Sequence, residues 1–270
     1  MRPRANTLIG GVLMTLLLAT AVTAAFWTPL DPLRVNLRAR LQPPSSLYWL
    51  GTDEFGRDVL SRVMAGASAS VIIALCTVVL AVGVGLMVGC LAGYLRGWTD
   101  RIIMAVNDAL LAFPGILLAL AVMIVAGANK FGLVLALGLA YTPSVARVVR
   151  GTVLSIREKE YIEASRVIGN SELYSMLRHV LPNAVAPVAV LATSMIGWVL
   201  LAESALSFLG LGVPPPAPTW GNMLAASRPF IETAVWLSIA PGLCIALTLL
   251  GINLLGDSLR DRLDPRMAQG

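Results

Sequence analysis

Long uncharged stretches recur along this 270-residue chain and restrict the folds that it can adopt. A helix needs roughly 20 apolar residues to cross a bilayer core, where lipid cannot satisfy backbone polar groups. Six segments reach or approach that length: residues 8–27, 63–95, 102–129, 131–146, 184–208 and 233–256. The fourth is short and would borrow length from Arg147 and Arg150, whose side chains can snorkel. The sequence predicts an all-α membrane protein with six transmembrane helices.

The charge distribution predicts the orientation of these helices. With 57% hydrophobic and 13% charged residues, the chain is too apolar for a soluble domain. Placing the N-terminus inside puts thirteen of the twenty Lys and Arg residues on the cytoplasmic side. Five of the other seven lie in one loop, residues 28–62, which is long enough for the positive-inside rule to count less. We therefore expect both termini in the cytoplasm and residues 28–62 outside it.

The residues needed for several kinds of chemistry are missing or scattered. Lys130 and Lys159 follow Asn129 and Glu158, so the chain has no GxxxxGK[ST] phosphate loop for ATP. One histidine and three dispersed cysteines cannot form a dedicated transition-metal site, and we expect no cofactor on this chain. The basic residues form no stripe for nucleic acid. The cysteines are expected to be small buried hydrophobes: Cys76, Cys90 and Cys244.

A polar stretch, residues 161–183, interrupts the apolar spans on the predicted cytoplasmic side. Its first part has a helical period, because Tyr161, Ala164 and Ile168 share one face while the charged residues lie largely elsewhere.

The first apolar segment, residues 8–27, could in principle be a cleavable signal peptide. That interpretation is disfavoured, since the run has spanning length and the remaining chain is membrane-embedded too.

Turn and cap signals divide the polar stretch into two helices. Gly169 is expected to end the first, and Asn170 or Ser171 to cap a second that runs from residue 172 to about 179. Pro182 is expected to end the second helix, because the residue before a proline avoids the helical region. The result would be two short helices joined by a tight turn. On these grounds alone, it could be an amphipathic loop that only connects two spans.

A motif in the same stretch resembles the EAA loop of bacterial ABC importer permeases. Glu163, Ala164 and Ser165 are followed by Gly169, and later by His179, Leu181, Pro182 and Asn183. Ser165 stands where the family often has alanine. The resemblance implies that residues 151–182 are a cytoplasmic loop whose coupling helix docks on an ATPase subunit. The residues that it assigns to this role are Glu163, Ala164, Ser165, Gly169, Asn170, Ser171, His179, Leu181, Pro182 and Asn183.

Four separated blocks extend the resemblance over nearly the whole chain: residues 48–63, 108–120, 203–224 and 256–266. They look like the C-type permease of the dipeptide, oligopeptide and nickel branch. The resemblance implies one permease domain, residues 1–270, with the type I ABC importer fold in a bacterial inner membrane. It also implies a second homologous permease, two ATPase subunits that bind ATP–Mg and an external solute-binding protein. Peptides and nickel chelates both remain open as cargo.

Charged groups within the spans are weak candidates for the translocation path, since burying a charge in a bilayer is costly. Asp108, near the inner end of the third span, could instead reach water or Arg101. Glu203, near the outer end of the fifth, could instead be paired or hydrogen-bonded at a permease interface. Pro114 is expected to bend the third span.

Three further patterns predict local contacts. Residue pairs four apart, Asp53 with Arg57 and Asp58 with Arg62, would support a short external helix capped by Thr52 or Asp53. That helix could cap the bundle or be touched by the solute-binding protein. Trp220 is expected at the outer membrane interface. A small-residue stripe is expected to let another helix approach closely: Ala81, Gly85, Gly89 and Gly93.

Two other classes of function remain as alternatives. An ion-gradient-driven secondary transporter would favour internal repeats and charges at the midplane, and we find no convincing repeat. A membrane-embedded enzyme would need acid, base or metal-binding residues at one depth. Asp108 and Glu203, however, are expected near opposite faces of the membrane. We therefore expect no catalytic residue and no metal-binding residue in this chain.

Overall fold

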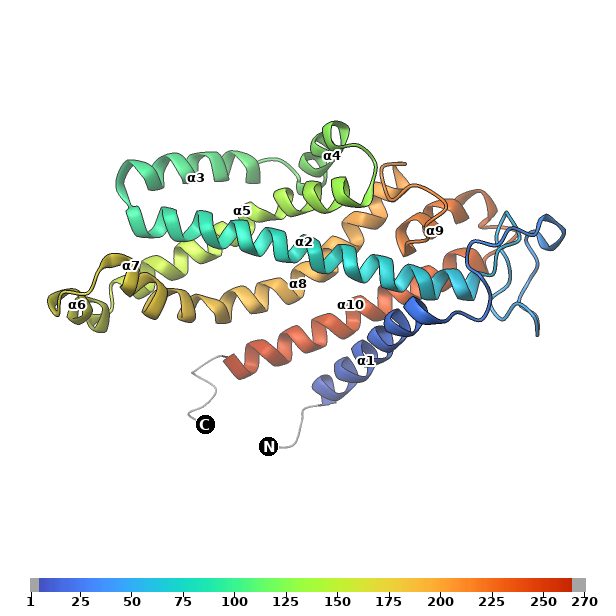
Figure 1. Cartoon of the computed structure of the whole chain (residues 1–270), viewed down its shortest axis with the longest axis horizontal. Helices are drawn as coiled ribbons and strands as arrows, with labels where there is room; N and C mark the ends of the chain where they lie inside the picture. Colours follow the sequence, from blue (N-terminus) through green and yellow to red (C-terminus); the bar gives the residue numbers. More distant parts are fainter. Residues whose placement is uncertain (1–4, 264–270) are drawn as a thin grey trace.

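The computed structural model describes residues 5–263, and all of their regular structure is helical apart from an isolated bridge between Thr52 and Asp58. The helices form an elongated bundle (Figure 1). They are α1 (Ala5–Phe26), α2 (Val59–Leu95), α3 (Gly97–Leu111), α4 (Gly115–Ala126), α5 (Lys130–Arg157), α6 (Glu160–Val167), α7 (Glu172–Ser175), α8 (Leu181–Phe208), α9 (Trp220–Ser227) and α10 (Trp236–Leu263), with single turns at Leu37–Ala39, Met176–Val180 and Arg228–Phe230.

Five helices of this bundle are long and apolar enough to span a membrane: α1, α2, α5, α8 and α10. The sixth predicted span is divided into α3 and α4, which meet at an angle of 95°. The break falls at Pro114, which precedes the first residue of α4 and cannot donate a backbone hydrogen bond. The all-α membrane fold is thus confirmed, with five spans, or six where α3 and α4 together count as one sharply bent span.

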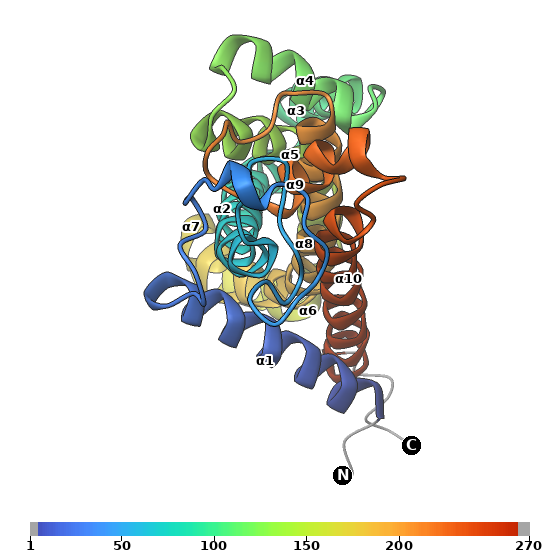
Figure 2. The ribbon, with the colours of Figure 1, turned by 90° about the vertical axis from the view of Figure 1, so that its right-hand side faces the viewer.

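The order of the helices places the two described ends of the chain on one side. The start of α1 and the end of α10 both point toward the end of the bundle that carries α6 and α7 (Figure 1). The loop at residues 27–58 and helix α9 lie at the opposite end. Seen along the bundle, α2 lies near the centre and α1 crosses its lower side (Figure 2). This arrangement fits the predicted topology, while the cytoplasmic placement of the termini stays a prediction.

Helix α1 is packed as part of the bundle. A Cβ placed on Gly10 would lie 2.9 Å from Cβ of Leu254 in α10, so the two backbones approach closely there. The hydroxyls of Thr7 and Ser258 are 2.7 Å apart. These contacts make α1 a partner of α10, as expected of a retained span.

The predicted small-residue stripe on α2 packs against α5. Cβ atoms placed on Gly85, Gly89 and Gly93 would lie 2.5, 2.7 and 2.9 Å from the Cβ atoms of three valines. Those valines follow one another at the same spacing of four residues: Val145, Val149 and Val153. The stripe is confirmed as a close helix–helix seam, hereafter the α2–α5 seam.

Helix α5 is longer than the sequence suggested. It has 28 residues and continues past position 146 to Arg157, so its added length includes Arg147 and Arg150, as predicted. Arg147 and Arg150 in this extension form ion pairs with acidic residues of α3. Arg150 Nε and Nη2 lie 2.5 and 2.7 Å from the carboxylate oxygens of Asp100. Helix α2, with 37 residues, is about 55 Å long and extends beyond a bilayer core.

Trp220 is not at an outer interface. It is 1% exposed, its indole Nε1 donates to the carbonyl of Val63 at 3.0 Å, and its backbone N–H donates to Ser70 Oγ at 3.2 Å. Both partners lie on α2, so Trp220 anchors α9 inside the bundle. The aromatic-belt expectation was wrong because the indole finds its hydrogen-bond acceptor in the protein.

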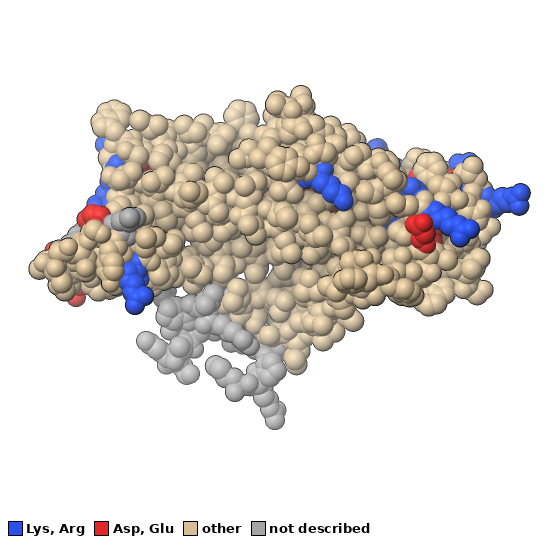
Figure 3. Space-filling model, in the orientation of Figure 1, with Lys and Arg blue, Asp and Glu red and all other residues tan. Residues whose placement is uncertain are grey.

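The cysteines and charges are distributed as follows. Cys90 is buried and Cys244 half-buried, but Cys76 is exposed, so the expectation of burial was wrong for that residue. On the face shown in Figure 3, charged side chains gather mostly toward the two ends of the bundle, and the surface between them is largely uncharged. A wide uncharged band of this kind suits contact with lipid.

Candidate functional site

The candidate site is the hairpin of residues 160–180, called here the α6–α7 hairpin, at one end of the bundle (Figure 1). It connects α5 to α8. The structure assigns residues 151–157 of the predicted loop to α5 and residues 181–182 to α8, so the part between these two long helices is residues 158–180.

The turn between α6 and α7 depends on a glycine. Gly169 has φ +92°, a conformation that L side chains rarely adopt, and α6 ends two residues before it. The N–H of Asn170 closes the turn by donating to the carbonyl of Ser165 at 3.1 Å. Ser171 Oγ accepts from the N–H of Tyr174 at 3.2 Å, and so caps the second helix. The predicted glycine stop and Ser171 cap are both confirmed.

The predicted stop at Pro182 was wrong. After α7 the chain makes one π-helical turn, Met176–Val180, and then continues directly into α8. The N–H of Leu181 donates to the carbonyl of Met176, which is five residues earlier. Pro182 lies in the first turn of α8, where a missing N–H costs little. The hairpin is therefore joined rigidly to α8 by a continuous run of helix.

Hydrogen bonds between small polar side chains hold the two halves of the hairpin together. Ser165 Oγ lies 3.1 Å from Ser175 Oγ and accepts from Asn170 Nδ2 at 3.1 Å. Ser165 and Ser175 are 5% and 0% exposed. Ile162, 1% exposed, packs in the bundle core beside them. Ser165 thus has an internal role, and sequence periodicity missed both Ser175 and Ile162.

The outer surface of the hairpin is unusually apolar. Val167 and Ile168 are 83% and 79% exposed, and Tyr161, Tyr174 and Leu177 are also exposed. We call these five residues the apolar patch. The predicted helix face of Tyr161 and Ile168 therefore points away from the bundle. In a segment too polar to span a membrane, such a surface indicates a contact with another molecule.

His179 lies between the two tyrosines of the apolar patch. Its ring makes edge contacts with Tyr161 and Tyr174, with centroids 6.1 Å apart in each case. Its backbone carbonyl accepts from Asn183 Nδ2 at 2.7 Å. One tyrosine from each half of the hairpin thus contacts the imidazole of His179, which is itself a motif residue.

The other residues assigned by the resemblance lie around this surface. Glu163 and Ala164 on α6 are exposed, as are Gly169, Asn170 and Ser171 in the turn. At the start of α8, Leu181 is half-buried while Pro182 and Asn183 are exposed.

The two weak translocation-path candidates have different surroundings. Asp108 Oδ1 accepts from Arg147 Nη2 at 2.6 Å, so its partner is Arg147 and not Arg101. Both side chains of this pair are 57% exposed. Arg101 instead lies over the ring of Trp98, 5.6 Å from its centroid.

Glu203 is enclosed by its own chain. It is 1% exposed, and Oε1 accepts from Thr219 Oγ1 at 2.8 Å and from Ser207 Oγ at 3.0 Å. A Cβ on Gly221 would lie 2.6 Å from its Oε2. Glu203 therefore ties α8 to the start of α9. The structure shows the hydrogen-bonding alternative, inside this chain and not at an interface.

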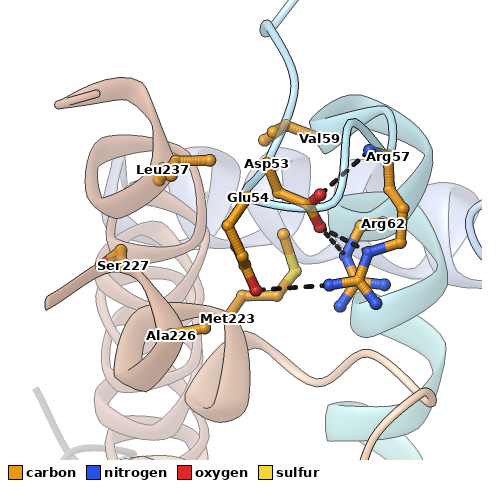
Figure 4. Close-up of a pocket in the computed structure, with 9 residues that line it drawn as sticks. All are labelled: Asp53, Glu54, Arg57, Val59, Arg62, Met223, Ala226, Ser227 and Leu237. Carbon is orange, nitrogen blue, oxygen red and sulfur yellow. Dashed lines mark hydrogen bonds and ion pairs between the residues drawn. The ribbon is translucent and has the colours of Figure 1, made fainter. Parts of the chain in front are cut away.

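A buried ion cluster closes the other end of the bundle (Figure 4). Asp53 Oδ2 lies 2.6 Å from Arg57 Nε and 3.3 Å from Arg62 Nε. Arg57 Nη2 lies 3.5 Å from Glu54 Oε1. Burial raises the pKa of Glu54, so keeping this carboxylate charged costs part of the stability that the ion pairs supply. The cluster lies between the loop at residues 27–58 and helices α9 and α10, beside Met223 and Leu237.

The predicted external helix in this region was wrong. Helix α2 begins only at Val59 and is capped by Asp58, whose Oδ2 accepts from Ser61 N and Oγ at 2.8 and 2.6 Å. Asp58 is thus occupied, and Arg62 pairs with Asp53 instead. The Asp53–Arg57 pair is confirmed, but both residues are buried and offer little surface to a binding protein.

Comparison with known proteins gives three consistent findings. Residues 85–269 match the family model described as binding-protein-dependent transport system inner membrane component. The chain is 42% identical over 259 residues to a putative peptide transport system permease protein of Brucella suis, covering 96% of this chain and 87% of that protein. It is also 42% identical over 258 residues to a glutathione transport system permease protein of Pectobacterium atrosepticum, covering 95% and 86%.

More distant matches agree with these. A dipeptide transport system permease protein of Alkalihalophilus pseudofirmus is 40% identical over 260 residues, covering 96% of this chain and 86% of that protein. Among solved structures, an inward-facing MetNI methionine ABC transporter matches with TM-score 0.62 and 19% identity, covering 75% of this chain and 96% of that chain. The structural match supports the same permease fold.

Proposed function

This chain belongs to the family of binding-protein-dependent transport system inner membrane components, and from that membership we propose that its α6–α7 hairpin is the surface through which ATPase subunits drive the import of short peptides. The chain is a multi-pass permease of the bacterial inner membrane in an ATP-driven importer with a binding protein. ATP–Mg is used by separate ATPase subunits. The ion-gradient-driven alternative was therefore wrong.

The apolar patch is the observation that supports a docking role for the hairpin. Val167 and Ile168 are 83% and 79% exposed at the end of α6, where none of the helices among residues 5–263 covers them. Interface cores are typically rich in aromatic and apolar side chains and poor in charge, and Tyr161 and Tyr174 fit that composition. The acidic residues Glu160 and Glu163 lie on the same helix and would form a polar rim.

The internal construction of the hairpin suits the transmission of movement. Ser165 and Ser175 join its two halves, and the π turn joins it to α8 without a flexible linker. A ligand shifts a two-state equilibrium only by binding one state better than the other. We propose that ATP-driven closure of the ATPase subunits changes their contact with the apolar patch, and so favours one of two arrangements of the bundle. A second homologous permease would complete the translocation path.

Short peptides are the proposed cargo because relatives that cover nearly this whole chain are named for peptide, dipeptide and glutathione transport. The binding protein that works with this permease should therefore bind di- and tripeptides. Isothermal titration calorimetry of that protein, with a dipeptide panel and with nickel plus histidine, tests the assignment. Heat released only with the nickel–histidine mixture would show that the cargo is a metal chelate.

The docking role predicts a crosslink from the tip of α6. Ile168→Cys, in a chain whose three native cysteines are replaced by alanine, is expected to capture an ATPase subunit when labelled with benzophenone maleimide and illuminated. The reason is that Ile168 is 79% exposed and belongs to the apolar patch. Gel mobility and mass spectrometry of the product, in the assembled importer, are the measurement.

A second cysteine position provides the control for this crosslink. Val185 is 58% exposed in α8, outside the apolar patch, and Val185→Cys is expected to capture no ATPase subunit. Equal capture from both positions, or none from Ile168→Cys, would contradict docking through this hairpin.

A further inference from the structure

The inner end of α2 is attached to the α6–α7 hairpin by a tyrosine. Tyr94, in the last turn of α2, donates its hydroxyl to the backbone carbonyl of Glu172 at 2.6 Å. The same hydroxyl also contacts the Glu172 carboxylate through Oε2. Glu172 is the first residue of α7, so this contact joins helices that lie 78 residues apart in the sequence. Hydrogen bonds to a charged group are stronger than those between neutral groups.

A second attachment reaches the same turn of α2 from α5. Arg157, the last residue of α5, donates from Nη1 to the carbonyl of Tyr94. Its guanidinium also lies over the Tyr94 ring, 5.1 Å from the ring centroid. The carbonyl of Tyr94 belongs to the last turn of α2, where carbonyls have no partner within the helix. Arg157 therefore caps α2 while it holds the tyrosine ring in place.

A third contact is weaker. Arg96 Nη2 lies 3.0 Å from Glu158 Oε1, but the two side chains are 46% and 73% exposed. Exposed pairs of this kind contribute little. This pair also joins α2 only to the end of α5, so the attachment of α2 to the hairpin itself depends on Tyr94.

We propose that Tyr94 is a positioning residue for coupling, which makes α2 a third helix that the hairpin moves directly. The chain itself joins the hairpin only to α5 and α8. Without Tyr94, movement of the hairpin would reach α2 only indirectly, through α5 and the α2–α5 seam. This inference rests on the proposed docking of ATPase subunits on the hairpin.

The α2–α5 seam explains why this attachment would matter. Two of its three glycines, Gly89 and Gly93, lie in the same end of α2 as Tyr94. A seam packed this tightly moves as one body. Movement delivered to Tyr94 would therefore pass along α2 toward the outer end, where Trp220 ties α2 to α9.

The test removes only the hydroxyl. Tyr94→Phe keeps the ring under Arg157 and loses both contacts with Glu172. In the complete importer reconstituted in liposomes with its binding protein and a transported dipeptide, we expect peptide imported per ATP hydrolysed to fall at least threefold. The amount of ATPase subunit bound and the melting temperature should stay at wild-type values. Glu172→Gln keeps an acceptor for the tyrosine hydroxyl but removes its charge, and it should lower the same ratio by less. It replaces Tyr94→Phe as the test variant if Tyr94→Phe folds poorly.

A matched tyrosine provides the control. Tyr141 also donates its hydroxyl to a backbone carbonyl on another helix, that of Trp198, at 3.3 Å. Tyr141→Phe should leave the import-to-hydrolysis ratio unchanged.

Three results would overturn the role of Tyr94: an unchanged ratio in Tyr94→Phe and Glu172→Gln, an equal fall in Tyr141→Phe, or loss of the ATPase subunits from Tyr94→Phe. The first two leave the Ile168→Cys crosslink intact, and so reject the tyrosine attachment without rejecting the docking surface.

Discussion

Gly169→Val is expected to reduce ATP-dependent uptake at least tenfold. Gly169 has φ +92°, and a Cβ built there meets nothing within 4 Å, so the substitution causes no clash and acts only through the backbone. A β-branched residue at positive φ is an outlier, and even a simple side chain costs roughly 1–2 kcal/mol in the left-handed region. The turn would open and displace Val167 and Ile168 from the docking geometry. Uptake of labelled dipeptide into proteoliposomes and co-purification of the ATPase subunits measure the effect.

Two other substitutions separate backbone strain from added bulk. Gly169→Asn should keep most of the uptake, because asparagine tolerates the left-handed region better than other residues. Gly151→Val puts the same side chain at a helical glycine in α5 that also has open space around it but no positive φ. Uptake lost equally at Gly151, or retained at Gly169, would show that the turn conformation is not required.

The hairpin shows which features can be predicted from sequence. Gly169 and Ser171 act within a few residues of themselves, through backbone conformation and a local cap, and both predictions were confirmed. Pro182 obeys an equally local rule but was misjudged. A π turn before it lets the helix continue, and Val180 in that turn is fully buried against the bundle. Tertiary packing there outweighs the backbone preference.

Charge pairs were predicted less well because their partners are distant in sequence. Asp108 pairs with Arg147, which is 39 residues away, and not with Arg101, the nearer cation. Asp58 was expected to pair with Arg62 at four residues' spacing. Instead, the Asp58 carboxylate accepts from the N–H of Ser61 as the cap of α2, and Arg62 pairs with Asp53. Sequence spacing identifies candidate ion-pair partners for a charged residue, but the groups that the fold brings around that residue decide which contact forms.

Contacts between helices were predicted better than ion pairs but less fully than local turns and caps. The glycine stripe on α2 predicted a close approach, since small residues at every fourth position have few other uses in a span. It could not predict which helix approaches. The matching valines on α5 have no distinctive pattern among so many apolar residues, and only the fold identifies Val145, Val149 and Val153 as the partners.

Gly89→Val is expected to destabilise the bundle more than any change on its surface. A Cβ at Gly89 would lie 2.6 Å from the carbonyl oxygen of Ala146 and 2.7 Å from Cβ of Val149. A backbone oxygen in the middle of α5 cannot retreat without moving that helix, so the two helices must separate. Overpacking of a tight core costs about 1–3 kcal/mol and more when backbone must shift. In a chain of this size, at about 2–4 °C per kcal/mol, that corresponds to a melting temperature lower by roughly 2–12 °C.

The same helix contains a control for this prediction. Gly83 also lies on α2, but a Cβ there meets nothing within 4 Å. Gly83→Val should melt within about 2 °C of wild type, because surface substitutions usually change stability by less than about 0.5 kcal/mol. The measurement is thermal unfolding of both variants in detergent. The readout is the fraction of protein that remains monodisperse as the temperature rises. If Gly89→Val melted like Gly83→Val, α2 and α5 would not be packed as one body, and Tyr94 could not pass movement from the hairpin to the outer end.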